Sequence, residues 1–90
     1  MKRIIQIIPH KDFTKQLKKQ SAKIQSKVKI KFRIFMNNQY NPILNNHALI
    51  GRWRGYRSIN ITGDTRAIYK QISHNLVVFV VLGTYSQLYS

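Results

Sequence analysis

The chain has 90 residues, and we expect residues 1–90 to form a single domain with a small core. It contains no cysteine, which excludes a disulfide framework and a zinc–thiolate site. Sixteen Lys and Arg residues face two acids, and the net charge of +14 predicts a polyanionic partner: nucleic acid, an anionic membrane surface or an acidic protein.

The start of the chain has only some features of a signal peptide. Met1-Lys2-Arg3 is followed by the apolar stretch IIQII, but Pro9 ends that stretch early and no small-residue cleavage site follows. The most apolar run, residues 76–82, is far shorter than the ~20 residues that a membrane-spanning helix needs. We therefore expect a soluble cytoplasmic protein.

The first elements follow from apolar spacing. Residues 3–9 (RIIQIIP) form a short apolar run closed by proline, which predicts a strand. Residues 11–20 place Phe13 and Leu17 four positions apart among lysines, which predicts a short amphipathic helix.

The next segment, residues 21–36, supports two interpretations. Ser21 is a candidate N-cap, and several apolar residues beyond it follow helical spacing: Ile24, Val28, Phe32 and Phe35. Residues 28–34 (VKIKFRI) nevertheless alternate as a half-buried strand would, and Lys31 interrupts the helical stripe. Periodicity alone does not decide between a helix and a strand.

The second half of the chain is typical of an antiparallel meander. Residues 37–46 are rich in Asn and contain Pro, which predicts a loop. Residues 51–83 then have the pattern of three consecutive strands, separated by turns at residues 62–64 (TGD) and 73–75 (SHN). The order of one strand, a helical region and a meander predicts an α+β fold.

Basic residues are sorted by type along the chain. Residues 1–33 hold nine Lys and two Arg, whereas residues 52–70 hold four Arg and a single Lys. Lysine suits diffuse, hydrated attraction, while the planar fork of arginine suits bidentate contacts to phosphate or carboxylate. We therefore expect the binding site in the second half.

Two stretches resemble the RelE/YafQ branch of bacterial type II toxins: residues 45–69 (NNHALIGRWRGYRSINITGDTRAIY) and residues 83–89 (GTYSQLY). The pattern typical of that branch comprises His-x-Leu-x-Gly, an Arg-x-x-His/Asn-Ile strand, a hairpin Asp, Arg-x-x-Tyr/Phe and a final Gly-Thr-His-Ser-x-Leu-Tyr/Phe. It appears here as His47 through Gly51, Arg57 through Ile61, Asp64, Arg66 through Tyr69, and Gly83 through Tyr89.

The resemblance implies both a fold and a function. Members of that branch have two N-terminal helices packed on a twisted antiparallel sheet, here of about four strands, so residues 21–36 are expected to be the second helix. They are small basic ribonucleases that cut messenger RNA on the ribosome and are inhibited by an acidic antitoxin. The implied partners are thus the antitoxin, the ribosome and messenger RNA, with no membrane and no cofactor. The toxin alone is expected to be monomeric, and to form a hetero-oligomer with its antitoxin.

The residues present limit the chemistry. Asp12 and Asp64 are the only carboxylates, too few for a magnesium cage, so no metal site is expected. Cutting RNA without a metal requires the ribose 2′-OH to attack the adjacent phosphate. The protein must then take that proton, stabilise negative charge on the phosphate and protonate the departing 5′-oxygen.

Five residues are candidates for this catalysis. His47 stands at the histidine position of the family pattern, and the reference pKa of histidine, about 6.5, suits a general base or acid. Asp64 matches the hairpin Asp, although Asp is also ordinary in turns. Arg66 matches a phosphate-binding arginine of the family. Tyr85 and Tyr89 match the C-terminal His and aromatic residue. The other two histidines are taken as structural or solvated.

Further residues are expected to bind RNA through charge, hydrogen bonds or stacking: Arg52, Trp53, Arg54, Arg57, Asn60 and Lys70. For the aromatic residues, covering a sheet edge is an equally good interpretation. A two-residue turn would pair Arg57 with Lys70, and a three-residue turn at residues 62–64 would place Asn60 opposite Arg66. We prefer the second register because it gathers Asn60, Arg66 and the turn Asp in one place.

The chain departs from the family pattern at Tyr85, where a His is usual. A phenol, with a reference pKa of about 10, is a poor base at neutral pH but can donate a proton or a hydrogen bond. Asn60 and Thr65 stand where some relatives carry His and Trp. Three explanations stay open: catalysis is carried by His47 and the arginines, activity is weak, or Tyr85 was introduced to weaken a lethal protein.

Three other functions compete with a ribosome-dependent ribonuclease. ParE-type toxins share the fold but inhibit DNA gyrase by binding, and a non-catalytic RNA-binding module would explain the missing C-terminal His. The HALIG and GTYSQLY stretches favour the ribonuclease. A membrane-binding protein is the least favoured, because the apolar residues fit the core of a sheet.

Overall fold

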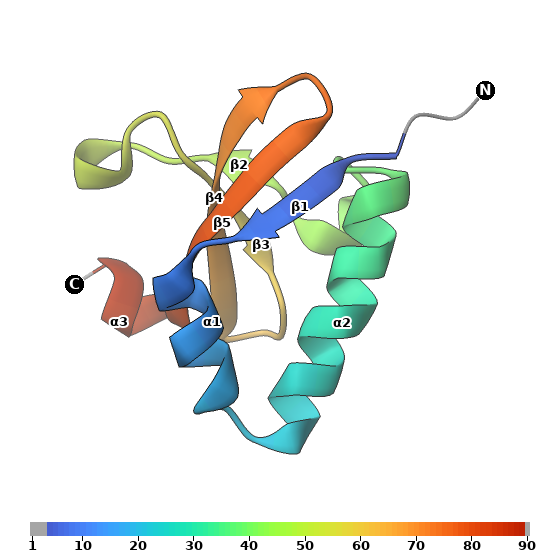
Figure 1. The fold of residues 1–90 in the computed structure, drawn as a ribbon. Coiled ribbons are helices and arrows are strands. Elements are labelled where there is room, and N and C mark those ends of the chain that lie inside the picture. The colour runs from blue at the N-terminus through green and yellow to red at the C-terminus, as the bar shows by residue number, and fades with distance from the viewer. Residues whose placement is uncertain (1–3, 90) are drawn as a thin grey trace.

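The computed structural model describes residues 4–89; residues 1–3, including the first residue of the strand expected over 3–9, lie outside this range. Its helices and strands, in chain order, are β1 (Gln6–Pro9), α1 (Lys11–Lys18), α2 (Ala22–Asn37), β2 (His47–Ala48), β3 (Arg57–Asn60), β4 (Thr65–Ser73), β5 (Leu76–Thr84) and α3 (Tyr85–Tyr89) (Figure 1). Two short 3₁₀ helices, Pro42–Leu44 and Gly51–Trp53, flank β2.

The strands form one sheet in the order β1-β5-β4-β3-β2. The expected α+β fold is confirmed, with two differences in detail. The sheet has five strands, because the two-residue β2 adds to β3, and it is mixed, because β1 pairs parallel to β5. The meander β3-β4-β5 is antiparallel as expected.

The ambiguous segment is a helix, as the family resemblance implied. Ser21 caps α2, its side-chain oxygen accepting a hydrogen bond from the Ile24 N–H at 3.2 Å. Val28 and Phe35 are buried on this helix against the sheet. Residues 28–34 form a helix although their pattern alternates like a strand, because the apolar residues at helical spacing pack into the core and tertiary packing overrides the local pattern. Within residues 4–89, no helix has the length and apolar character that spanning a membrane would require.

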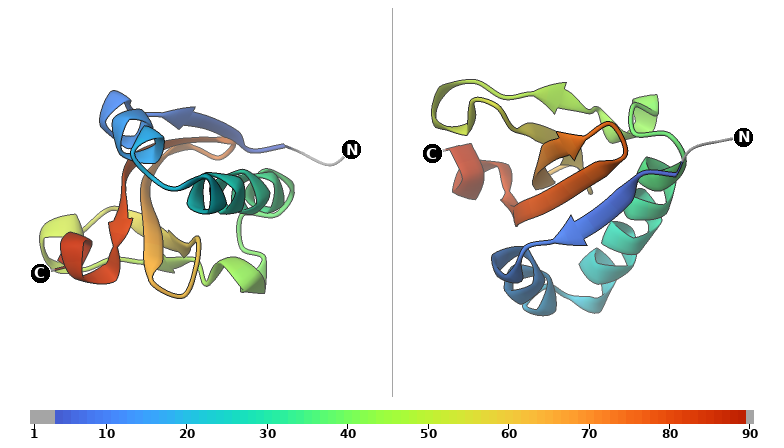
Figure 2. Two further views of the ribbon diagram at one scale, coloured as in Figure 1. Left: turned by 90° about the horizontal axis from the view of Figure 1, so that it is seen from below. Right: turned by 45° about the horizontal axis from the view of Figure 1, so that its top comes forward.

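The core lies between the two N-terminal helices and one face of the sheet (Figure 2). Its centre is a cluster of aromatic rings: Phe35 lies 5.1 Å from Tyr69 and 5.3 Å from Phe79, measured between ring centroids, and Phe13 of α1 lies 5.7 Å from Phe79. Each of these rings is fully buried, and burying one such side chain stabilises the fold by about 1.5–3 kcal/mol. The cluster ties α1 and α2 to β4 and β5.

The Tyr69 hydroxyl fastens the loop after α2 to the sheet. It accepts hydrogen bonds from Gln39 Nε2 at 2.9 Å and from Asn46 Nδ2 at 2.7 Å. Burial raises the pKa of Tyr69 above its usual value, because the phenolate would lose its hydration. The loop carries the chain into β2, so this contact also positions His47.

Tyr69→Phe should lower the free energy of unfolding by about 1–3 kcal/mol, because the amides of Gln39 and Asn46 lose their buried acceptor. The raised pKa means that the folded protein keeps a proton that the unfolded chain releases, so stability falls as pH rises above about 10. Urea unfolding from about pH 8 to about pH 11 should show a steeper decline in the wild type than in Tyr69→Phe. Equal stabilities with parallel pH profiles would contradict this.

Candidate functional site

A pocket of about 360 Å³ brings together three of the predicted catalytic residues. His47 and the three residues after it, Ala48, Leu49 and Ile50, form one wall, and Tyr85 and Tyr89 of α3 form the other. We call this the His47 pocket. Its walls come from segments far apart in the sequence, β2 with its following residues and the C-terminal helix. A ligand in the pocket would therefore lie against His47, Tyr85 and Tyr89.

The backbone before β2 sets the hydrogen bonding of His47. Asn45 adopts a left-handed conformation (φ 48°), and its carbonyl lies 2.9 Å from His47 Nδ1. A carbonyl can only accept, so Nδ1 carries the hydrogen and Nε2 is the nitrogen left to exchange a proton with a ligand. The ring is exposed, and β2 pairs His47 with Ser58 of β3. This arrangement suits a general base.

The β3–β4 hairpin holds Arg66 in place. Asn60 pairs with Arg66 across the hairpin, which confirms the preferred register. Arg66 Nη1 donates to the carbonyls of Thr62 at 3.0 Å and Gly63 at 2.8 Å, and its guanidinium lies 5.8 Å from the Tyr85 ring. With Nη1 used in this way, the edge formed by Nε and Nη2 is the part of the fork that a phosphate can bind.

The C-terminal segment forms α3, whose start is fixed to the hairpin. The Tyr85 N–H donates to the Asp64 carbonyl at 3.0 Å, so Asp64 acts through its backbone while its side chain is exposed. The rings of Tyr85 and Tyr89 lie 4.7 Å apart. The Tyr89 hydroxyl is buried and has no hydrogen-bond partner among the described residues, which costs free energy.

A double hydrogen bond ties the segment after β2 to α3. Arg52 Nη2 and Trp53 Nε1 both donate to the Leu88 carbonyl, each at 2.9 Å. This tight bend needs glycine at two positions, because Gly51 (φ 68°) and Gly55 (φ 93°) adopt backbone conformations that favour it. The structure thus gives Arg52 and Trp53, predicted to bind RNA, a role in positioning the helix that carries Tyr85 and Tyr89.

The other predicted RNA-binding residues lie on β3, on β4 and just after the 3₁₀ helix Gly51–Trp53. Arg57 Nε donates to Asn46 Oδ1 at 2.8 Å. Lys70 Nζ lies 5.6 Å from the Tyr56 ring, and Arg54 is exposed. These residues lie outside the lining of the His47 pocket.

Sequence reasoning missed Asn46, which joins Arg57 to the Tyr69 hydroxyl, and the Leu88 and Thr62 carbonyls that hold arginines. Residues 37–46 contain several Asn, and the sequence does not indicate which of them hydrogen-bonds to Tyr69 and Arg57. Backbone acceptors leave no signal in a sequence.

Arginines at the site are held by neutral acceptors. Arg52, Arg57 and Arg66 donate to backbone carbonyls or to an amide oxygen. Among residues 4–89 the one close contact between a basic side chain and a carboxylate joins His10 Nδ1 and Asp12 Oδ2, at 3.8 Å, and that nitrogen accepts the Asp12 N–H. No three His, Cys, Asp or Glu side chains in that range gather as a metal site would require. The positive potential at the site is therefore left for an anionic ligand.

An α+β chain of this size, with β2 and a C-terminal helix meeting at one pocket beside the β3–β4 hairpin, has the architecture of RelE-type toxins. A family profile described as "Bacterial toxin of type II toxin-antitoxin system, YafQ" matches residues 5–90. The chain therefore belongs to the YafQ family of toxins of bacterial type II toxin–antitoxin systems, which confirms the resemblance.

Solved structures agree with this assignment. YafQ from E. coli strain BL21(DE3) is 26% identical, with a TM-score of 0.78 over 96% of this chain and 99% of that one. The toxin in the E. coli DinJ-YafQ toxin–antitoxin complex is 26% identical, with a TM-score of 0.76 over 100% of both chains. A YoeB/ParE toxin from Agrobacterium tumefaciens, 15% identical with a TM-score of 0.74 over 90% and 99%, shares the fold. A search of curated proteins finds no match.

Trp53→Phe keeps the aromatic ring but removes the indole N–H that binds the Leu88 carbonyl. We expect hydrogen exchange at the amides of Leu88 and Tyr89 to become about fivefold faster, the effect of losing one bond worth ~1 kcal/mol. Tyr56→Phe is the matched control, because it changes the ring packed against Trp53 without touching α3. Unchanged exchange in Trp53→Phe would show that the bond does not hold the helix.

Proposed function

We propose that this toxin is a ribosome-dependent messenger-RNA endonuclease of the cytoplasm, inhibited by an acidic antitoxin. The observation that carries the proposal is the His47 pocket, which joins an imidazole and two phenols next to an arginine held by neutral carbonyls. Membership of a toxin family supports it, as does the antitoxin named in the E. coli complex. The net charge of +14 suits both RNA and an acidic inhibitor.

The proposed reaction needs no metal. Nε2 of His47 accepts the proton of the ribose 2′-OH, which attacks the adjacent phosphate. The free Nε/Nη2 edge of Arg66 stabilises the negative charge that builds up on the phosphate oxygens. Tyr85, an exposed residue that lines the pocket, donates its hydroxyl proton to the departing 5′-oxygen, and the Tyr89 ring provides a surface for a base to stack on. The products are a 2′,3′-cyclic phosphate and a 5′-hydroxyl.

His47→Ala should lower the cleavage rate by about 10²- to 10⁴-fold, the usual contribution of a general base. The measurement adds purified protein to a cell-free translation reaction and maps messenger-RNA ends by primer extension, with naked RNA alongside. His74→Ala is the matched control, because His74 is exposed in the β4–β5 turn. New ends at codon boundaries that persist in His47→Ala would contradict the role of His47.

Arg66→Ala should lower the same rate by about 10²- to 10³-fold, since it removes the charge that stabilises the transition state. Arg33→Ala, an exposed arginine on α2, removes the same charge at a distance from the pocket. If the two variants lost activity equally, net charge rather than a positioned guanidinium would explain the effect.

Tyr85→His should raise cleavage, because an imidazole exchanges protons at neutral pH more readily than a phenol does. Tyr85 is 56% exposed, so the smaller ring fits without strain in the core. The comparison uses the same primer-extension reaction at equal protein concentration. Equal rates for the two forms would show that Tyr85 does not limit the reaction.

A further inference from the structure

Ile50 has an unusual position for an apolar side chain. Its surface is 90% accessible, and no other large apolar side chain of residues 4–89 is as exposed. It is also one of the six residues that line the His47 pocket. A single exposed apolar residue is ordinary on a protein surface, so the informative observation is that this one belongs to the wall of the candidate active site.

The backbone on both sides of Ile50 is fixed. The Leu49 N–H donates to the Tyr56 carbonyl at 2.9 Å, and the Arg54 N–H donates to the Gly51 carbonyl at 3.0 Å. The double hydrogen bond described above ties the same loop to α3. Isoleucine is branched at Cβ, which restricts its first side-chain torsion. The loop therefore holds the Ile50 side chain as a rigid apolar projection.

The opposite wall of the pocket offers surfaces on which RNA bases can stack. The rings of Tyr85 and Tyr89 lie 4.7 Å apart, measured between their centroids, and both residues line the pocket. Aromatic rings hold bases by stacking, whereas an aliphatic side chain inserted between two bases removes their stacking on each other. The pocket thus combines a stacking surface on one wall with an apolar wedge on the other.

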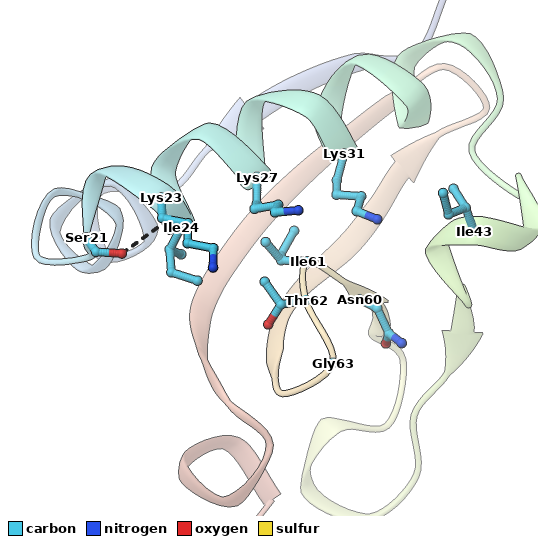
Figure 3. A pocket seen from close by; sticks show the side chains of 10 residues that line it. All are labelled: Ser21, Lys23, Ile24, Lys27, Lys31, Ile43, Asn60, Ile61, Thr62 and Gly63. Carbon is cyan, nitrogen blue, oxygen red and sulfur yellow. Dashed lines mark hydrogen bonds between the residues drawn. The ribbon is translucent and has the colours of Figure 1, made fainter.

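The larger hollow of the molecule is less suited to bases. It measures about 610 Å³ and lies between α2 and the β3–β4 hairpin (Figure 3). Lys23, Lys27 and Lys31 line it, none of its lining residues is aromatic, and it shares no lining residue with the His47 pocket. Lysines attract phosphates but offer bases no ring to stack on. The His47 pocket is therefore the better place for a base.

Separating two bases would help the proposed reaction. The attacking 2′-OH must lie in line with the departing 5′-oxygen, and a regularly stacked strand does not hold it there. A nucleotide that leaves the stack is free to turn its ribose and phosphate into the aligned geometry. A side chain that is already rigid loses little conformational entropy when it binds in this way.

We propose that Ile50 unstacks the RNA at the cut site, its side chain entering between the base held on the tyrosine rings and the neighbouring base. Ile50 is then a residue that positions the substrate and takes no part in proton transfer. The inference rests on the proposed function, because it takes RNA as the ligand of the His47 pocket.

The test uses a short RNA oligonucleotide with two adjacent 2-aminopurine bases at its centre, whose mutual stacking is measured by circular dichroism at wavelengths where the protein does not absorb. Deoxyribose at these positions prevents cleavage. Saturating wild-type protein should abolish most of the stacking signal. Ile50→Ala should leave most of it intact while binding the RNA within about threefold of the wild-type affinity, because phosphate contacts dominate affinity.

Two further variants serve as controls. Ile50→Leu keeps an apolar side chain of the same size and should unstack the bases as the wild type does. Ile72→Ala shortens another exposed isoleucine, at 53% exposure and outside the pocket lining, and should also behave as the wild type. Because Ile50 contributes almost nothing to the core, Ile50→Ala should fold normally.

An intact stacking signal in the wild-type complex, or equal loss of it in the wild type and Ile50→Ala, would overturn the proposal. Absence of RNA binding by the wild-type chain would overturn it too. If the wild type unstacks the bases and Ile50→Ala does not, but no messenger RNA is cut in the primer-extension reaction, the role of Ile50 stands and the nuclease is contradicted.

Discussion

The pairing of β4 with β5 determines where α3, and with it the Tyr85 and Tyr89 wall of the His47 pocket, lies. Arg66 pairs with Gly83 and Thr65 with Thr84, so β5 ends beside the hairpin and α3 begins at the Asp64 carbonyl. Gly83 eases this close return: a Cβ there would lie 2.9 Å from Gln87 Oε1 and 3.3 Å from Leu88 Cδ2, so both side chains would have to shift. The same register holds Tyr85 next to the guanidinium of Arg66. A slip of one residue would turn Arg66 into the core.

Charge is divided between two surfaces with different chemistry. Lys23, Lys27 and Lys31 line a groove beside α2 that has no carboxylate in its lining, so their charge can act on an anionic ligand from a distance. The arginines near α3 are fixed by carbonyls, and fixed donors stabilise developing charge without reorganising during the reaction. The β3–β4 hairpin contributes to both surfaces, because Thr62 and Gly63 line the groove and their carbonyls hold Arg66.

Local pattern was enough to predict the meander and its turns, because strand alternation and turn residues act over a few positions. Of the two registers that the turn at residues 62–64 allows, the structure has the one that pairs Asn60 with Arg66, which the gathering of candidate site residues favoured. The helix over residues 28–34 needed the family resemblance, since burial of Val28 depends on a sheet formed later in the chain. The hydrogen bond from Trp53 to the Leu88 carbonyl joins residues 35 positions apart, so no local sequence pattern could predict it. The five residues of α3 are likewise too few to show a helical period.

The chemistry of the cut ends tests the central claim most directly. Ribosome-bound messenger RNA treated with the wild-type chain in the presence of a strong metal chelator can be analysed by mass spectrometry of its fragments. Metal-independent attack by the 2′-OH predicts 2′,3′-cyclic phosphate and 5′-hydroxyl ends. Fragments with 3′-hydroxyl and 5′-phosphate ends, or cutting that stops when the chelator is added at a concentration that leaves the ribosome intact, would contradict the mechanism derived from the His47 pocket.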